Sequence, residues 1–258
     1  MVFYLIGPVI WQLITSLKPN AILTSLPPVL PEKVVFTHYV SVFTERPFAR
    51  IILNSFIVAT STTVYCLAIG VLSAFAISIF DIKGKALFLG LVLSISMFPP
   101  IATVSPLYLL IRALGIRDTY LALIFPYATF ALPLSIWVLS SFISEIPKEL
   151  YKAARVDGCT PLQALWKVLF PLAAPGVFTC AILVFIFAWN EFLYALTFTT
   201  TVQSRTIPVA IALFPGLHEV PWGEMAAASI IVTAPLVILV FVFQKRIISG
   251  LTAGSVKG

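Results

Sequence analysis

The stretch Val168–Asn190, VLFPLAAPGVFTCAILVFIFAWN, contains no ionisable side chain. A helix needs roughly 20 predominantly apolar residues to cross the hydrocarbon core of a bilayer. This stretch is long enough, and it shows neither the 3.6-residue period of an amphipathic helix nor the alternation of a half-buried strand. It is therefore predicted to form a helix that is apolar on all sides, as a membrane-spanning helix is.

Five further stretches share this lack of charge, and every segment between them carries charged residues. The composition agrees with a membrane protein, because 60% of the residues are hydrophobic and only 10% are charged. The predicted fold is an all-α membrane protein with one transmembrane domain over residues 1–248 and a tail over 249–258. The six predicted transmembrane helices cover residues 1–17, 51–80, 86–111, 119–144, 168–190 and 225–244.

Several functional classes do not fit this sequence. The net charge of +6 comes from scattered Lys and Arg residues with no continuous basic patch, which argues against a nucleic-acid partner. The three cysteines are too scattered for a disulfide framework or a zinc site. No GxxxxGK[ST] phosphate loop occurs, so a separate subunit is predicted to bind and hydrolyse ATP. The chain itself is predicted not to be an enzyme and to hold no cofactor or metal.

The two ends of the chain are predicted to lie on the cytoplasmic side. Six spans put both termini on one side, together with residues 81–85 and 145–167. These segments hold nine of the sixteen Lys and Arg residues, so the positive-inside rule favours this side weakly. The first stretch lacks the charged leading region of a signal peptide and is expected to be a retained span. Whether an N-terminal extension precedes it stays open.

Residues 145–170 form a predicted helix–turn–helix elbow outside the bilayer. Pro147 suits the start of a helix, and Asp157 and Gly158 supply its end. Thr160 is the expected N-cap of a second helix, with Gln163 as its capping-box partner. We expect Pro171 to interrupt that second helix at the membrane.

The first helix of the elbow has two distinct faces. Lys148, Lys152 and Arg155 recur three or four residues apart on one face. The other surface is small and partly apolar, with Leu150, Ala153, Ala154 and Gly158. The pattern alone leaves two interpretations open, in which the basic face rests on anionic lipid head groups or the helix docks onto a partner protein.

The runs LYKAARVDG (150–158) and LWKVLFP (165–171) resemble the EAA loop of the permeases of binding-protein-dependent ABC importers. The resemblance implies a cytoplasmic coupling helix that sits in a cleft of the ATP-hydrolysing subunit. Lys152 departs from the family pattern, because an acidic residue usually stands there. The residues implied in ATPase coupling are Leu150, Lys152, Ala153, Ala154, Arg155, Asp157, Gly158 and Pro171.

Three further runs are similar to the smaller permease of maltose- and trehalose-type importers: TSLKP (15–19), FAWNEF (187–192) and GLTAGSVKG (250–258). The resemblance implies import of a sugar, a disaccharide such as trehalose or maltose, across the cell membrane. The implied partners are a second homologous permease, a dimer of ABC ATPase subunits that bind ATP and Mg, and an extracytoplasmic, lipoprotein-type binding protein. Thr252, Gly254 and Lys257 of the tail are implied in a further ATPase contact.

Asn190 and Glu191 end the fifth predicted span and are candidates for the translocation path. An ionisable group at membrane depth usually faces the bundle or water. The alternative is that Glu191 lies solvated at the outer interface. A rival function is an ion-coupled secondary transporter or channel, in which Glu191 binds the ion. The sequence does not indicate which sugar is carried.

Overall fold

The computed structural model describes residues 2–23, 30–31, 33–216 and 220–253, and in these residues all regular secondary structure is helical. The predicted all-α class is therefore confirmed. The elements are α1 (Val2–Ser16), η1 (Asn20–Ile22), α2 (Thr37–Thr44), α3 (Phe48–Ile79), α4 (Lys85–Ser96), α5 (Pro100–Ala113), α6 (Leu121–Glu145), α7 (Lys148–Val156), α8 (Pro161–Ala164), the π-helical turn η2 (Leu165–Leu169), α9 (Phe170–Asn190), α10 (Leu193–Phe198), α11 (Ile207–Ala212) and α12 (Trp222–Ala253).

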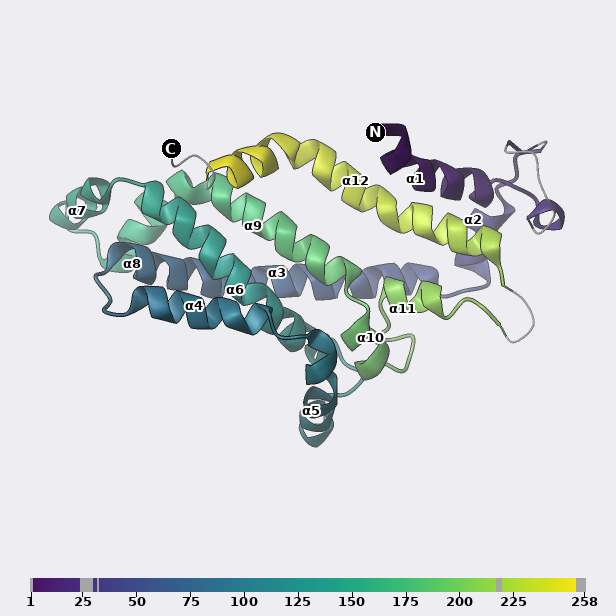
Figure 1. The fold of residues 1–258 in the computed structure, drawn as a ribbon, viewed down its shortest axis with the longest axis horizontal. Helices are drawn as coiled ribbons and strands as arrows, with labels where there is room; N and C mark the ends of the chain where they lie inside the picture. Colours follow the sequence, from purple (N-terminus) through teal and green to yellow (C-terminus); the bar gives the residue numbers. More distant parts are fainter. Residues whose placement is uncertain (1, 24–29, 32, 217–219, 254–258) are drawn as a thin grey trace.

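The long helices lie side by side and define two ends of the molecule (Figure 1). At one end lie α7, α8 and the beginnings of α4 and α9, with the end of α12 close by. At the other end lie α2, the beginning of α3 and the beginning of α12. Helix α5 projects from the side of this body. The predicted elbow and the segment around α2 are thus at opposite ends.

Fewer helices are long enough to span a membrane than the six predicted. Among the described residues, four helices qualify by length and composition: α3, α6, the continuous helix Pro161–Asn190, and Trp222–Phe243 of α12. The number is five if α4 and α5 form one bent span. Helix α1 has only 15 residues, and its rise of about 22 Å is short of the roughly 30 Å core.

The predicted span over residues 86–111 is not a single helix. It is divided into α4 and α5, which meet at 86° across a break at 97–99. Pro99 and Pro100 cause the break, because a proline has no N–H to donate and disfavours helical geometry in the residue before it. Composition revealed the apolar character of this stretch but not its sharp bend.

Pro171 does not interrupt the second elbow helix, contrary to the prediction. The helix runs from Pro161 to Asn190 without a break. It passes through the π-helical turn Leu165–Leu169, in which the N–H of Phe170 donates to the carbonyl of Leu165. A wider turn relieves the clash that a proline ring makes with the carbonyl four residues earlier, so Pro171 is accommodated.

The described residues between 18 and 50, which lie between the first two predicted spans, include short helices. They contain η1, α2 and the first turn of α3. His38 of α2 is buried and its Nε2 lies 2.8 Å from the carbonyl oxygen of Lys18. Arg46 donates to the Glu224 carboxylate at 2.9 Å, which ties this segment to the start of α12.

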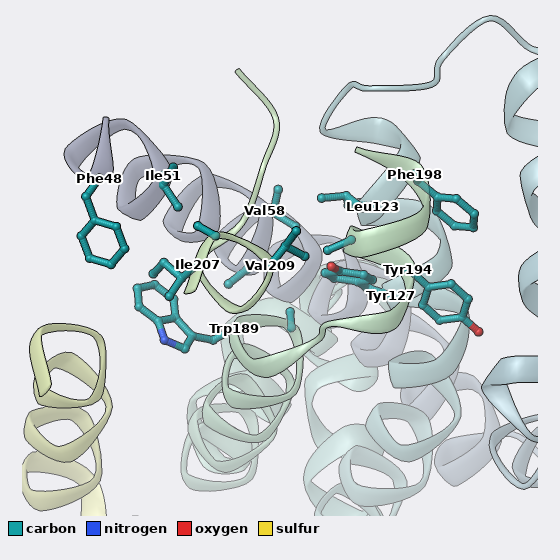
Figure 2. Close-up of a cluster of buried hydrophobic side chains, with 14 of the residues drawn as sticks. Phe48, Ile51, Val58, Leu123, Tyr127, Trp189, Tyr194, Phe198, Ile207 and Val209 are labelled. Carbon is teal, nitrogen blue, oxygen red and sulfur yellow. The ribbon is translucent and has the colours of Figure 1, made fainter. Parts of the chain in front are cut away.

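Two buried clusters hold the bundle together, one toward each end. The cluster toward α2 joins side chains from α3, α6, α9, α10 and α11, including those of Phe48, Tyr127, Trp189 and Phe198 (Figure 2). The cluster toward the elbow joins α3, α6, η2 and α9. Burial of such side chains stabilises a fold by about 1.5–3 kcal/mol each in water, whereas inside a bilayer close packing takes over that role.

Close packing is tightest where α9 crosses α6. A Cβ atom built on Gly176 would lie 2.2 Å from Cγ of Phe142. We therefore expect Gly176→Ala to lower the unfolding temperature of the detergent-purified protein by several degrees, a loss of about 1–3 kcal/mol.

The matched control is Gly90→Ala in α4, because a Cβ at Gly90 has no neighbour within 4 Å. This variant should match or slightly exceed the unfolding temperature of the parent, because alanine favours a helix more than glycine does. The double variant Gly176→Ala with Phe142→Ala should lower the unfolding temperature by less than the sum of the two single decreases. Equal unfolding temperatures for Gly176→Ala and Gly90→Ala would show that α6 and α9 do not pack in this way.

Candidate functional site

The elbow is fixed to the bundle by an aromatic contact. The ring of Tyr151 in α7 packs edge-on against those of Phe75 and Phe80, with centroid distances of 5.9 and 6.3 Å. Both phenylalanines lie at the end of α3. Lys148 also lies 3.7 Å from the carboxylate of Asp81, but both side chains are exposed and such a pair contributes little. The position of α7 therefore follows that of α3.

The turn between the two elbow helices is closed by local hydrogen bonds. Gly158 has a φ of +88°, the left-handed conformation that glycine adopts most readily. The N–H of Cys159 donates to the carbonyl of Ala154 at 3.0 Å. The predicted capping box is present, since the N–H of Gln163 donates to the Thr160 hydroxyl and the Thr160 N–H donates to the Gln163 amide oxygen.

Most of the predicted coupling residues are exposed together on this elbow. Ala154 differs, because it is buried and its small side chain allows α7 to pack closely on the following turn. Pro171 lies apart from the turn, in the first turn of α9. The exposed members are Leu150, Lys152, Ala153, Arg155, Asp157, Gly158 and Pro171.

Three exposed apolar side chains of the elbow were not predicted from the sequence. Val156 is 86% exposed, and Leu162 and Trp166 are at least half exposed. Together with Leu150 they add exposed apolar surface to the charged side chains of the elbow. The amphipathic pattern of α7 contained the signal, because Val156 follows a basic residue at the exposed end of the helix. Such a mixed surface is typical of a protein-docking site.

At the opposite end, a buried amide holds the segment 200–205 in place. Asn54 of α3 is fully buried and donates to the carbonyls of Val202 and Arg205 at 2.8 and 2.9 Å. Its amide oxygen accepts a hydrogen bond from the Tyr120 hydroxyl at 2.7 Å. Every polar group of this side chain is therefore bonded, which lets an amide lie at no net cost inside the bundle.

Asp118 makes a second attachment for the same segment, 200–205. Its carboxylate accepts hydrogen bonds from the backbone N–H groups of Thr200 and Thr201, at 2.7 and 3.0 Å, and from the Ser204 hydroxyl. Partial burial alone would raise the pKa of Asp118, but these hydrogen bonds outweigh it and hold the pKa well below its usual range. Its φ of +62° is one that Asp and Asn tolerate better than most residues.

The two path candidates lie where α9 ends: Asn190 is its last residue, and Glu191 begins the link to α10. The Glu191 carboxylate accepts hydrogen bonds from the N–H groups of Tyr194 and Ala195, at 2.8 and 3.2 Å, and so caps α10. Asn190 is exposed, and its amide donates back to the carbonyl of Ile186. Glu191 thus has a structural partner, and its role in a path stays a prediction.

The predicted tail contacts lie largely beyond the described part of the chain. Gly254 and Lys257 are outside the described residues, and Thr252 is described only as part of the backbone of α12. Among the described residues, no group of three His, Cys, Asp or Glu side chains is placed to hold a metal ion.

The architecture and the elbow can now be compared with known proteins. Residues 66–252, which include α7, α8 and both of their neighbouring spans, match the family described as the binding-protein-dependent transport system inner membrane component. The chain belongs to this family. It is thus a multi-pass membrane component of a transport system, and the predicted assignment as an importer permease is confirmed.

Curated relatives of this permease extend over its whole length. It is 46% identical over 260 residues to the trehalose transport system permease protein SugB of Mycobacterium tuberculosis, covering 100% of this chain and 94% of that protein. It is 44% identical over 254 residues to the trehalose/maltose transport system permease protein MalG of Thermococcus litoralis, with coverages of 97% and 91%.

The fold of the permease matches a solved transporter structure. A crystal structure of a bacterial ABC transporter involved in the import of the acidic polysaccharide alginate has a TM-score of 0.82, at 24% sequence identity. The match covers 95% of this chain and 91% of the other. At that identity the likeness shows a shared fold.

The Asp118 attachment of the permease can be tested by substitution. Asp118→Ala removes three hydrogen bonds and places alanine at a left-handed φ, so we expect a loss on the order of 2–4 kcal/mol. Asp118→Asn keeps an oxygen acceptor and the tolerance for this φ, and it should lose less than half as much. Thermal unfolding of both variants in detergent measures the difference.

The pH dependence provides an independent readout. Because the pKa of Asp118 is lowered on folding, its stabilisation is complete above the unfolded pKa of about 3.9 and is lost as the pH falls through the folded pKa. The difference in unfolding temperature between the parent and Asp118→Asn should be constant from pH 8 to pH 5. A difference that shrinks within this range would contradict the hydrogen-bonded carboxylate.

Proposed function

We propose that this chain is the translocation subunit of an ATP-driven importer of a sugar, a disaccharide such as trehalose or maltose. The family assignment supports the importer, and the names of two relatives that align over nearly their whole length support the sugar. Dependence on a binding protein, which the family description states, fits poorly with the ion-coupled alternative.

The exposed elbow is the observation that carries this proposal. A docking element has to keep its shape while a partner pushes on it, and α7 is fixed by the Tyr151 contacts while the turn is closed by the capping box. Its exposed apolar side chains, with Val156 at 86% exposed, support a protein partner that covers them on docking. We assign this surface to the ATPase subunit.

In the proposed assembly, the elbow end is cytoplasmic and both termini lie on that side. The chain then crosses the membrane six times, with α1 as the first crossing and the bent pair α4–α5 as the third. The partners are a second, related permease, a dimer of ATPase subunits that bind ATP and Mg, and an extracytoplasmic solute-binding protein. Thr252, Gly254 and Lys257 of the tail add a further contact with the ATPase.

Helix α3 provides a direct connection between the two ends in this mechanism. Its end contacts Tyr151 of the elbow. Its beginning holds residues 200–205, the outer segment in this assembly, through Asn54. Closure of the ATPase dimer would move α7, and the 32-residue α3 would carry that movement to the outer segment. The path would thereby open alternately to the two sides of the membrane.

The decisive variant is Gly158→Val, tested in the complex with the second permease and the ATPase. A side chain at Gly158 points into open space but strains the left-handed backbone, so the turn and the exposed surface change shape. We expect at least a tenfold loss of ATPase retained on the tagged permease, equivalent to about 1.4 kcal/mol. ATP-dependent uptake of labelled trehalose or maltose should fall in parallel.

Gly115→Val is the matched control for this experiment. Gly115 also has a left-handed φ, +69°, and open space around its Cβ, but it lies in the link between α5 and α6, away from the elbow. It should retain the ATPase at the parent level. Equal retention by the two variants would refute the assignment of the elbow to the ATPase. If the parent complex takes up neither trehalose nor maltose, the proposed substrate is refuted.

A further inference from the structure

A cleft opens between the end of α3 and the start of α4, at the elbow end of the molecule (Figure 1). It has a volume of about 270 Å³ and is lined by side chains of both helices and of the link between them: Ser73, Ala76, Ile77, Ile82, Lys85 and Phe88. Helix α4 packs mainly on α6, which leaves space between its first turn and α3. The cleft therefore follows from the way α4 is seated on the bundle.

The cleft begins at the membrane surface and extends into the bilayer. The link carries Asp81, Lys83 and Lys85, and charged residues next to a span mark the level of the lipid head groups. Helix α3 ends at Ile79, and Ser73 lies about 9 Å before that end along the helix axis. The cleft thus covers the depth at which a phospholipid has its phosphate, its ester groups and the first part of its acyl chains.

The walls of the cleft are apolar. Ala76 and Ile77 line it from α3, Ile82 lines it from the link, and Phe88 lines it from α4. Ile82 and Phe88 are 45% and 50% exposed, so they present hydrocarbon to whatever fills the space. Water between such walls is unfavourable, whereas an acyl chain is the material that surrounds the protein at this depth.

Two polar groups of the cleft have no partner among the described residues. The Lys85 ammonium forms no ion pair there, and Asp81, the acidic residue of the link, lies 3.7 Å from Lys148 instead. The Ser73 hydroxyl makes no hydrogen bond in the described part of the chain, unlike the hydroxyl of Ser78 on the same helix. At the edge of the hydrocarbon, both groups gain from a ligand that brings oxygen acceptors.

A phospholipid with a net negative charge meets all of these requirements. Its phosphate oxygens pair with Lys85, an ester oxygen accepts from Ser73, and an acyl chain lies along the apolar walls. A zwitterionic lipid carries the same phosphate, but its own cation competes with Lys85 for it. Basic pockets between membrane helices are a general type of site for anionic head groups.

We propose that this cleft is a binding site for an anionic phospholipid, with the phosphate at Lys85 and an acyl chain beside Phe88. The site requires neither the ATPase nor the sugar, so it stands apart from the proposed function. The lipid fills the space that the packing of α4 on α6 leaves open, and it supports the first half of the third crossing.

Native mass spectrometry of the full-length chain in detergent tests the site. Phosphatidylglycerol and phosphatidylcholine with identical acyl chains are titrated in turn, so that only the head group differs. The variants are Lys85→Gln at the mouth and Ala76→Phe on the wall. The matched controls are Lys167→Gln, at an exposed lysine of the elbow, and Leu72→Phe, at an exposed position of α3 outside the cleft. Unfolding temperatures check that each variant is folded.

We expect the parent to bind phosphatidylglycerol about fivefold more tightly than phosphatidylcholine, which is the effect of one lysine near an anionic surface. Lys85→Gln should reduce this preference to below about twofold, because the cation is lost, and Lys167→Gln should retain it. Ala76→Phe should weaken the binding of both lipids by roughly threefold or more, because the ring occupies the place of the acyl chain, whereas Leu72→Phe should not.

Equal affinities of the parent for the two lipids would overturn the site, and so would a preference that survives Lys85→Gln. Displacement of bound phosphatidylglycerol on addition of the second permease and the ATPase would assign the cleft to a protein contact and overturn the site as well. If the chain forms no complex with these partners, the proposed function fails while the lipid site stands.

Discussion

The packing of α3 against α6 is the contact on which the rest of the molecule depends. The two helices approach closely at Gly70, where a Cβ would lie 3.0 Å from the Leu139 side chain. The Ser78 hydroxyl donates to the carbonyl of Ser140 at 3.1 Å near one end of the pair. Apolar side chains gain little from leaving lipid, so such close contacts and internal hydrogen bonds take the place of the hydrophobic effect.

The two ends of the molecule follow from this pair. At one end α3 presents Phe75 and Phe80, on which the elbow rests, and at the other it presents Asn54, to which the segment 200–205 is bonded. Neither attachment involves a long flexible loop. A rigid central helix with a partner surface at each end is the simplest device for transmitting a movement across a membrane.

The sequence predicted the membrane class and the elbow well, because both depend on local signals. Long runs without charge reveal spans, and the spacing of Thr160 and Gln163 reveals a capping box without any knowledge of the neighbours. The family resemblance contributed the proposed role of the elbow in docking the ATPase. The residues that hold the segment 200–205 were not predicted. Asn54 and Asp118 form hydrogen bonds with groups that lie 82 to 151 residues away along the chain, and such distant partners leave no local signal.

The sequence was less informative where a proline acts in its three-dimensional context. Pro99 and Pro100 break a helix, whereas Pro171 is absorbed by a π-helical turn, and composition cannot distinguish the two outcomes. The burial of Ala154, on the inward face of α7, likewise depends on how that helix is rotated about its axis. These differences concern geometry within elements whose existence the sequence did predict.

The docking of the ATPase on the elbow is tested most directly by a photo-crosslinker in place of Val156, the most exposed apolar residue of α7. The complex, reconstituted in vesicles with its binding protein, is irradiated with and without ATP. We predict capture of the ATPase subunit at a yield that changes with nucleotide. Capture of lipid or of the binding protein, with no ATPase product in either condition, would contradict the coupling role of the elbow.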